Sequence, residues 1–480
     1  MSGAVIAVEH VSWAYSGSRC WALTDINLAI NAGEFIAVMG ENGAGKTSFC
    51  RLLNGLIPHS LPGRLVGTVT VAGIRTDSST VAQLARKVGS VFDDPLTQLF
   101  TARVSDEAAF ALENLLTPPG EIRERVSRAL EAVGLSGYAD YAPSALSGGQ
   151  KQRLAIAAAL AMAETILVLD EPVSQLDPDG AKDVLALIND LCLHKKLTVV
   201  MAASSGKEAE LADKVCVLHN GSLAAYDTPQ RIFADSRLLD TCGIAAPDCQ
   251  FSGFGIPRGP LQAGTILRIQ NVCYQYTGGR MILHDINLDI RENDFIIITG
   301  HNGSGKTTLL KNICGLLRPV QGNILLGERD TAEMGISEIA EHIGFIMQDP
   351  DQQLFESTVY DEVAFSLKRA GKKEIITKAE EALSTVGLLD RRTDFPLALC
   401  RADRVKAVFA AILAMGPRII MLDEPFAGQD MRGCRLIMDI LAGLHRNGYT
   451  ILVVTHNAHV MADARRLVVM KDGSIVSDSG

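Results

Sequence analysis

The chain of 480 residues consists of two copies of one sequence pattern. Shifting the sequence by about 260 residues superposes Val11–Tyr15 on Val272–Tyr276 and Asp25–Leu28 on Asp285–Leu288. The match continues through both halves, and the offset falls to about 252 near the ends. Since the same pattern must fold twice, we predict a first domain at 1–242 and a second at 266–480. Residues 243–265 carry three prolines and no periodic apolar pattern, which predicts a linker.

Short runs of Val, Ile and Leu alternate with helical patterns in each copy. In the first copy the run Phe35–Met39 precedes a helical pattern at Thr47–Leu56, and Ile166–Leu169 is a later run. Apolar strands between helices are typical of a parallel sheet that is covered on both faces, so we predict an α/β fold in both copies. The longest apolar run, Leu154–Ala163, is about half of the roughly 20 residues that a membrane-spanning helix needs.

A glycine-rich loop follows the first strand of each copy. The first reads Gly40-Glu41-Asn42-Gly43-Ala44-Gly45-Lys46-Thr47, and the second reads Gly300-His301-Asn302-Gly303-Ser304-Gly305-Lys306-Thr307. This spacing, between a strand and a helix, predicts a phosphate loop whose backbone amides, lysine and threonine hold nucleotide phosphates and Mg²⁺. The expected phosphate-binding residues are Gly40, Asn42, Gly43, Gly45, Lys46, Thr47, Ser48, Gly300, Asn302, Gly303, Gly305, Lys306, Thr307 and Thr308.

An acidic pair ends a second apolar strand in each copy, Asp170-Glu171 and Asp423-Glu424. Beside a phosphate loop, the aspartate is expected to bind Mg²⁺ and the glutamate to polarise a water molecule as a general base. A turn cap after the strand is the alternative.

The sequence Leu146-Ser147-Gly148-Gly149-Gln150 opens an apolar helix in the first copy. Its free N–H groups, its hydroxyl and the helix dipole suit a phosphate, although a serine cap with turn glycines is an equally simple explanation. The matching stretch of the second copy, Leu399-Cys400-Arg401-Ala402-Asp403, lacks the hydroxyl and both glycines and gains a carboxylate.

Phosphate loop, LSGGQ motif and acidic pair together resemble the ATPase subunit of ATP-binding cassette transporters, over nearly the whole chain. The resemblance implies two tandem ATPase domains, each with a mainly parallel sheet, an antiparallel β subdomain and a helical subdomain that carries the LSGGQ motif. It implies ATP and Mg²⁺ as cofactors. Tyr15 and Tyr276 would stack on adenine, although a tyrosine beside Trp13 could also belong to the core.

The same resemblance assigns a glutamine that contacts Mg²⁺ and a histidine that contacts the γ-phosphate. The second copy has both, as Gln348 and His456, whereas the first has Asp93 and Ser204. It also assigns Ser174–Asp177 to the loop that links the two sites.

Domains of this family pair head to tail, so each nucleotide would lie between one phosphate loop and the other copy's LSGGQ position. One site would then combine Lys306, Thr307, Gln348, Asp423, Glu424 and His456 with Ser147–Gln150. The other would combine Lys46, Thr47, Asp170 and Glu171 with Asp93, Ser204 and residues 400–403. We therefore expect one active site and one that mainly binds ATP.

The stretches Asp94–Phe100 and Asp349–Phe355 share the pattern DPxxQLF. This pattern resembles energy-coupling-factor ATPases, which contact an integral membrane coupling subunit and act with a separate substrate-binding membrane subunit to import vitamins or transition-metal ions. It implies a peripheral protein at the cytoplasmic face of the membrane. A surface turn without a partner is the alternative.

Charge and cysteine usage argue against nucleic-acid-binding, lipid-binding and metal-binding classes of protein. The net charge is −10 and no basic run is present, so neither nucleic acid nor lipid is indicated as a partner. The ten cysteines include no CxxC pair, which argues against a zinc or iron–sulfur site. A fused sugar-import ATPase is the nearer alternative, although it lacks the DPxxQLF stretch. A soluble tandem-cassette translation factor, which typically has a long charged linker and basic surfaces, is the other.

Overall fold

The computed structural model describes residues 4–18, 20–162, 164–174, 176–195, 197–247, 264–276, 279–369, 371, 374–399, 401–457, 460–461 and 464–479. The chain divides into two compact units, Met1–Cys249 and Gln250–Gly480. Most of the expected linker lies outside the described residues. Its first part does not: Ile244 is buried in the core of the first unit.

The first unit contains two sheets. An antiparallel sheet has the order β2-β1-β4-β5, and a six-stranded sheet has the order β10-β9-β3-β8-β7-β6 and is parallel except for the β9–β10 pair. The strands are β1 (Ala4–Tyr15), β2 (Leu23–Asn31), β3 (Phe35–Met39), β4 (Gly63–Val71), β5 (Ile74–Arg75), β6 (Val88–Val91), β7 (Ile166–Asp170), β8 (Thr198–Ala202), β9 (Lys214–His219) and β10 (Ser222–Asp227).

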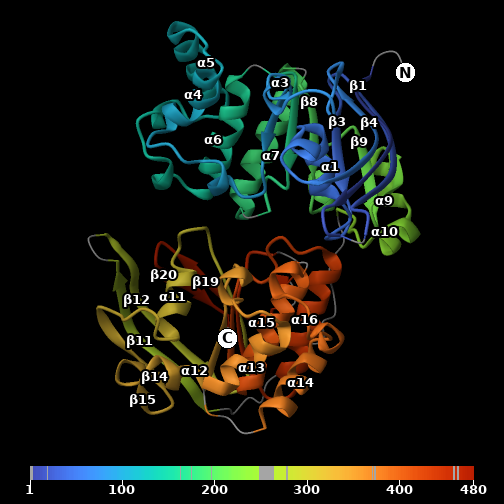
Figure 1. Ribbon diagram of the computed structural model, residues 1–480. Coiled ribbons are helices and arrows are strands. Elements are labelled where there is room, and N and C mark those ends of the chain that lie inside the picture. Colours follow the sequence, from blue (N-terminus) through green and yellow to red (C-terminus); the bar gives the residue numbers. More distant parts are fainter. Residues whose placement is uncertain are drawn as a thin grey trace. The chain divides into compact units, whose positions relative to one another are not determined.

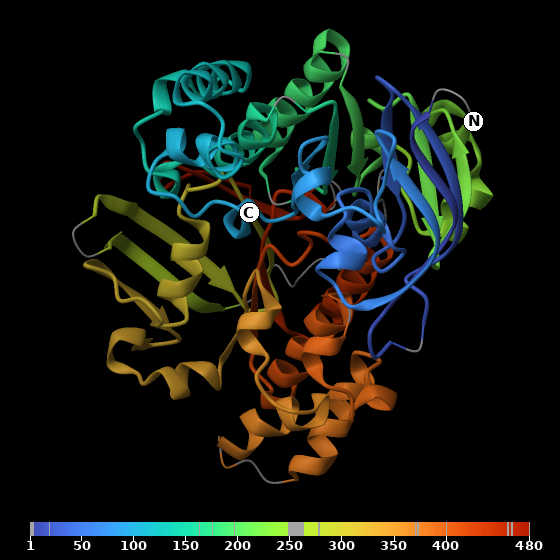
Figure 2. The same cartoon turned by 45° about the horizontal axis from the view of Figure 1, so that its top comes forward.

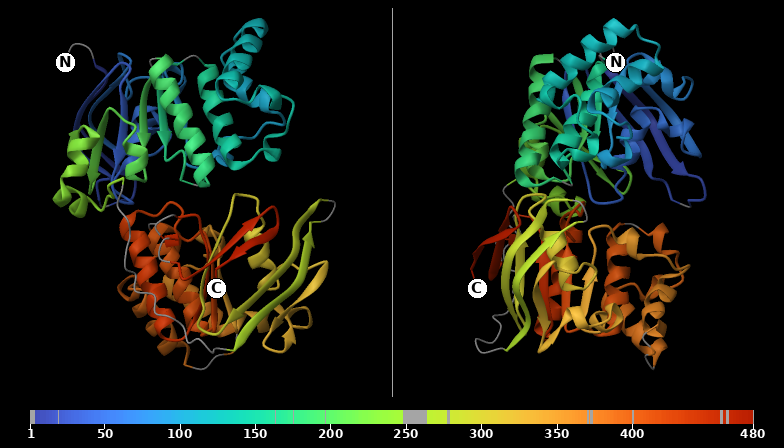
Figure 3. Two further views of the ribbon diagram at one scale, coloured as in Figure 1. Left: turned by 180° about the vertical axis from the view of Figure 1, so that it is seen from behind. Right: turned by 90° about the vertical axis from the view of Figure 1, so that its left-hand side faces the viewer.

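The helices of the first unit fall into two groups. Figure 1 shows α4, α5 and α6 at the opposite end of the unit from β1 and β4, and Figure 3 shows the same separation from behind. The helices are α1 (Lys46–Leu53), α2 (Leu56–His59), α3 (Val81–Leu84), α4 (Val104–Asn114), α5 (Pro119–Ala132), α6 (Gly148–Ala161), α7 (Pro178–Lys195), α8 (Gly206–Ala209), α9 (Pro229–Ala234) and α10 (Ser236–Cys242), with short 3₁₀ turns η1 (Pro95–Thr97), η2 (Ser136–Tyr138) and η3 (Pro143–Ala145).

Alternating side chains of the parallel strands enter two different cores. Phe35, Ala37 and Met39 of β3 pack in the cluster that includes helices α4 to α7, whereas Ile36 and Val38 pack in the cluster that includes the antiparallel sheet. Because both faces are covered, the strands consist of apolar residues throughout. The α/β prediction is confirmed.

The first predicted helix ends earlier than its apolar pattern. The pattern extends to Leu56, but α1 ends at Leu53 and a separate short helix follows. Gly55 has φ 77°, the left-handed conformation that terminates a helix.

The second unit has the same topology. Its sheets have the orders β12-β11-β14-β15 and β16-β17-β18-β13-β19-β20. The strands are β11 (Thr265–Gln275), β12 (Met281–Arg291), β13 (Phe295–Thr299), β14 (Gln321–Leu326), β15 (Arg329–Asp330), β16 (Ile343–Ile346), β17 (Ile419–Asp423), β18 (Thr450–Val454), β19 (Arg466–Lys471) and β20 (Ser474–Asp478).

In Figure 2 the orange helices of this unit lie at the opposite end from the olive strands β11 and β12. The helices are α11 (Lys306–Ile313), α12 (Ile336–Ala340), α13 (Val359–Arg369), α14 (Ile375–Thr385), α15 (Arg401–Met415) and α16 (Met431–Arg446), with 3₁₀ turns η4 (Thr331–Glu333), η5 (Pro350–Gln353), η6 (Leu389–Arg391) and η7 (Pro396–Ala398). In the part of the chain that the structure describes, no helix has both the length and the apolar character needed to cross a bilayer.

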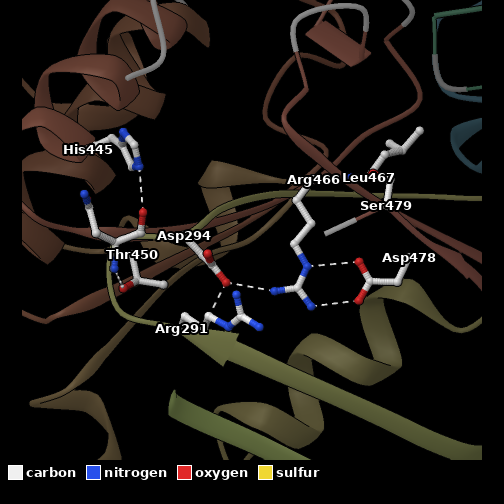
Figure 4. Close-up of polar contacts among 9 residues, drawn as sticks. Arg291, Asp294, His445, Thr450, Arg466, Leu467, Asp478 and Ser479 are labelled. Carbon is white, nitrogen blue, oxygen red and sulfur yellow. Dashed lines mark hydrogen bonds and ion pairs between the residues drawn. The ribbon is translucent and has the colours of Figure 1, made fainter. Parts of the chain in front are cut away.

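A polar network joins the sheet strands of the second unit to one another (Figure 4). The guanidinium of Arg466 pairs with Asp478 through two hydrogen bonds, of 3.0 and 2.7 Å, and with Asp294 at 2.8 Å. Asp294 also accepts the backbone N–H of Arg291. These contacts tie the C-terminal hairpin to the start of β13, the strand that leads into the phosphate loop.

Candidate functional site

Both phosphate loops require glycine for steric reasons. Gly45 and Gly305 have φ of 106° and 97°, values that side chains rarely adopt. A Cβ atom at Gly40 would lie 2.4 Å from the carbonyl oxygen of Leu218, and one at Gly300 would lie 2.1 Å from that of Met470. The loops therefore keep the tight shape in which backbone N–H groups can surround a phosphate.

The lysine of each loop is buried and turns back onto the loop itself. Lys46 Nζ donates to the carbonyl of Gly40 at 2.9 Å, and Lys306 Nζ donates to that of Gly300 at 2.6 Å. The ammonium groups thus lie inside the loops, where the sequence predicts nucleotide phosphates.

Each loop threonine bonds to the aspartate that ends the second strand. Thr47 Oγ1 donates to Asp170 at 3.2 Å, and Thr307 Oγ1 donates to Asp423 at 2.7 Å. The tertiary structure thereby brings together two predicted Mg²⁺ ligands that lie more than a hundred residues apart.

Asp170 and Asp423, the two predicted Mg²⁺ ligands, are buried carboxylic acids. Burial, with the nearby charge of Glu171, raises the pKa of Asp170 to about 6, and burial also raises the pKa of Asp423. Asp423 Oδ1 is buried and has no hydrogen-bond partner among the described residues. Carboxylate and hydroxyl oxygens are the ligands that Mg²⁺ prefers, so these residues fit that ion.

The two glutamates that the sequence predicts to be general bases share an uncommon backbone conformation. Glu171 and Glu424 have φ of 45° and 48°, and each backbone N–H donates to the neighbouring strand, at Ala202 and Val454. A left-handed non-glycine residue beside a binding loop is typical of a functional position.

The carboxylates of these glutamates have different partners in the two units. Glu424 Oε1 lies 2.9 Å from His456 Nδ1, whereas Glu171 Oε1 lies 3.2 Å from Lys46 Nζ. The difference follows from the residue after the neighbouring strand, which is His456 in one unit and Ser204 in the other.

Ser204 bonds to a residue that the sequence did not single out, Glu208. Its backbone N–H and its hydroxyl donate to the two carboxylate oxygens of Glu208 at 3.0 and 2.9 Å, and Ser205 Oγ donates at 2.7 Å. Burial raises the pKa of Glu208. The matching residue of the second unit is Val460, and this exchange of an apolar residue for an acid is the signal that could have found it.

Tyr15 and Tyr276 lie beside the helices that follow the phosphate loops. The hydroxyl of Tyr15 is 2.8 Å from Ser48 Oγ, and that of Tyr276 is 3.4 Å from Thr308 Oγ1. Their rings pack edge-on against Trp13 and Tyr274. Neither tyrosine is fully buried, which keeps adenine stacking as a prediction for both.

The LSGGQ motif forms a helix cap within its own unit. Ser147 Oγ accepts the backbone N–H of Gln150, and the Gln150 side chain accepts the backbone N–H of Ser147, so the two form a capping box at the start of α6. Gly149 lies close to Gly180 of α7. Ser147 is exposed, so its capping role leaves the predicted phosphate contact untested.

The substituted motif of the second unit carries a neutralised carboxylate. Asp403 accepts hydrogen bonds from Arg391 and Lys406, each at 2.7 Å. Cys400 lies outside the described residues, as does Gln175 in the predicted linking loop of the first unit. The acid that replaces Gln150 is therefore paired with cations of its own unit.

Gln348 and Asp93 follow β16 and β6 and are exposed. The charge of Asp93 contributes to the raised pKa of Asp170, so this substituted residue lies within electrostatic reach of the predicted Mg²⁺ position.

Hydrogen bonds from a glutamine and a glutamate fix the conformation of the DPxxQLF stretch in each unit, and we call it the braced stretch. In the first unit, Gln98 accepts the N–H of Phe92 and donates to the carbonyl of Ser90, and Glu107 accepts the N–H groups of Phe100 and Thr101. Gln353 and Glu362 make the same contacts in the second unit. Sequence reasoning missed Glu107 and Glu362, which stand at the same place in both copies.

This bracing holds large apolar side chains in solvent. Leu96 is 61% exposed, Phe100 is 65% exposed and Phe355 is 63% exposed. The two phenylalanines pack edge-on against Phe110 and Phe365. Such exposed apolar residues on a rigid loop are typical of an interaction surface.

An apolar groove adjoins the braced stretch in each unit. The first, of about 270 Å³, is lined by Phe100, Phe110 and residues of α3 and α6. The second, of about 600 Å³, is lined by Phe365 and residues of α12, α13 and α15. We call these the first and second docking grooves.

The first docking groove contains an acid. Glu164 packs so closely on Gly89 that a Cβ atom there would lie 2.0 Å from the carboxylate, and burial raises the pKa of Glu164 to about 9. The matching residue of the second unit is Pro417.

Comparison with known proteins gives consistent matches over the whole chain. The family model described as ABC transporter matches residues 23–174 and 283–427, together more than half of the sequence. An ABC transporter ATP-binding protein of Caldanaerobacter subterraneus is 36% identical, covering 99% of this chain and 91% of its own length. One of Methanosarcina acetivorans is 34% identical, covering 98% and 85%. Among solved structures, cbiO1 of Clostridium perfringens, described as part of the ABC transporter complex cbiONQ, is 32% identical over 45% of this chain and 88% of its own, with a TM-score of 0.42.

Proposed function

Because the chain belongs to the ABC transporter family, whose ATP-binding domains bind and hydrolyse ATP, we propose that it energises a multi-subunit membrane importer with both of its ATPase domains in one polypeptide. The observation that carries this proposal is the braced DPxxQLF stretch beside an apolar groove, present in both units.

The second unit has the more complete catalytic set. Glu424 acts as the general base for the attacking water, and the contact with His456 orients both groups. An imidazole with a proton on each ring nitrogen can donate from Nδ1 to the carboxylate and from Nε2 to a second acceptor, which is the γ-phosphate in our proposal. Lys306 balances the charge of the phosphates.

Mg²⁺ would be held by Thr307, Asp423 and Gln348 in one site and by Thr47 and Asp170 in the other, and it would supply charge neutralisation at the β- and γ-phosphates. The unpartnered Oδ1 of Asp423 supports this assignment.

The first unit has the less complete set of predicted catalytic residues. The one hydroxyl proton of Ser204 is donated in a hydrogen bond to Glu208, so this side chain has no donor left for a phosphate. Glu171 is paired with the phosphate-loop lysine. If the domains pair head to tail, this unit's nucleotide also meets the substituted stretch at 400–403. We propose that this site mainly binds ATP.

The membrane partner is an integral coupling subunit that inserts one apolar segment into each docking groove, together with a separate substrate-binding membrane subunit. This arrangement is that of an energy-coupling-factor importer for vitamins or transition-metal ions, with the present chain peripheral at the cytoplasmic face. The support is the DPxxQLF pattern and the exposed Phe100 and Phe355.

Affinity purification from detergent-solubilised membranes of the source cells tests this proposal. The double variant Phe100→Asp/Phe355→Asp should lose a small integral membrane protein that the unaltered chain retains. Val476→Asp, at an exposed apolar residue of β20, is the control and should retain it. Retention of the same partner by the double variant, or recovery of ribosomes in its place, would overturn the proposal.

A further inference from the structure

A basic groove lies on the surface of the first unit between β5 and α3. It is open, has a volume of about 700 Å³, and contains three cationic side chains, Arg75, Arg86 and Lys87, with the polar side chains of Ser78, Ser79 and Gln83. No carboxylate is among the described residues that line it. This is a local positive surface on a chain whose net charge is −10.

Two of the three cations are not engaged within the unit. Arg75 forms two hydrogen bonds with Asp77, at 3.1 and 2.7 Å. The exposed side chains of Arg86 and Lys87 have no hydrogen bond or ion pair with another described residue. Their charge is therefore presented to solvent, together with the side-chain NH₂ group of Gln83. The two serines are engaged within the unit, since Ser79 Oγ donates to the carbonyl of Arg75 and the Ser78 side chain bonds to Asp77.

The basic groove shares helix α3 with the first docking groove. Val81 and Ala85 line the docking groove, whereas Ala82, Gln83 and Arg86 line the basic groove. The two grooves therefore lie on either side of this short helix.

The described residues of the second unit do not repeat the three cations of this groove. The residues of that unit at the matching positions are Asp330 for Arg75, Glu341 for Arg86 and His342 for Lys87. The charge is thus a property of one unit and does not follow from the repeated fold.

We propose that the basic groove binds the phosphate groups of anionic membrane lipids beside the docked membrane subunit. The inference rests on the proposed function, because the neighbouring docking groove is what puts this face against the bilayer. Guanidinium and ammonium groups attract a headgroup phosphate, and the side-chain NH₂ group of Gln83 can donate a hydrogen bond to its oxygens. Contact of this kind would hold the first unit to the membrane independently of the protein partner.

Vesicle co-sedimentation of the full chain without its membrane partners tests the proposal. Vesicles of equal parts phosphatidylglycerol and phosphatidylcholine should bind the chain, and vesicles of phosphatidylcholine alone should not. Arg86→Glu should weaken binding to the anionic vesicles by at least about fivefold, since each basic residue near an anionic surface contributes roughly that factor. Arg237→Glu makes the same charge change at an exposed arginine of α10 and should leave binding unchanged.

Further measurements identify the ligand and exclude misfolding. Arg86→Gln should weaken binding less than Arg86→Glu, and both should keep the thermal unfolding midpoint of the unaltered chain. Equal binding to both vesicle types, equal effects of Arg86→Glu and Arg237→Glu, or complete competition by inorganic phosphate at the concentration of the lipid would overturn the proposal. Loss of the membrane partner from the phenylalanine variants is measured separately, so the failure of the proposed function and that of lipid binding are distinguishable.

Discussion

His456 Nδ1 lies 2.9 Å from Oε1 of Glu424 in the second unit. The matching glutamate of the first unit, Glu171, instead pairs with Lys46 at 3.2 Å. The residue at the matching position after the neighbouring strand is His456 in the second unit and Ser204 in the first. The expected general base therefore contacts an imidazole in the second unit and the phosphate-loop lysine in the first.

The first prediction concerns the two glutamates. Glu424→Gln should lower steady-state ATPase activity by at least about 10²-fold, because it removes the general base of the more complete site. Glu171→Gln, the matched change, should lower it less than about twofold, because the site it serves turns over little. Equal losses in the two variants would contradict the asymmetry.

The second prediction concerns the residues that follow β8 and β18. His456→Ala should lower kcat by about 10- to 100-fold, the effect of one hydrogen bond to a charged group. Ser204→Ala should leave kcat nearly unchanged, because the hydroxyl of Ser204 is bonded to Glu208. Steady-state ATP hydrolysis at saturating ATP measures both. A comparable loss in Ser204→Ala would show that this serine contacts the nucleotide.

A third prediction separates the two roles of Ser147. Ser147→Asp keeps a good helix cap but places a carboxylate where the γ-phosphate is expected, so it should retain stability and lose at least about tenfold in ATPase activity. Ser147→Ala should lower the free energy of unfolding by about 1 kcal/mol through the lost cap. Urea denaturation and ATPase assays provide the two readouts. Full activity in Ser147→Asp would leave capping as the only role of this serine.

The fourth prediction is a pH dependence of stability that arises from Glu164. Its pKa is about 9 in the folded chain and 4.5 in the reference state, so the folded form binds the proton more tightly. The free energy of unfolding should therefore fall as pH rises from 4.5 toward 9, by at least about 1 kcal/mol between pH 5 and 8.

Glu164→Gln removes this titration while keeping the shape of the side chain. Urea unfolding followed at several pH values should show the variant to be more stable than the unaltered chain at pH 8 and similar to it near pH 4.5. A parallel pH dependence of the two proteins would mean that the carboxyl is ionised and solvated in the folded state.

Much of the site could be predicted from local sequence. The phosphate loops were recognisable because a tight turn that wraps a phosphate demands glycine, as the φ of 106° at Gly45 confirms. The pairs Asp170-Glu171 and Asp423-Glu424 were recognisable because the end of a buried strand places them at the sheet edge beside those loops. The structure confirms that each acidic pair lies beside its phosphate loop, because Thr47 contacts Asp170 and Thr307 contacts Asp423.

The sequence by itself therefore determined the repeat, the α/β class and the residues of the phosphate loops, since these depend on periodicity and on short-range backbone geometry. Only the tertiary structure decided that Glu208 accepts a hydrogen bond from the Ser204 hydroxyl, that Asp403 is neutralised by Arg391 and Lys406, and that Arg75 joins Arg86 and Lys87 in one groove. Each of these depends on which side chains meet after folding. Burial and pairing then set the charge that a residue presents, and neither quantity is a property of the residue type alone.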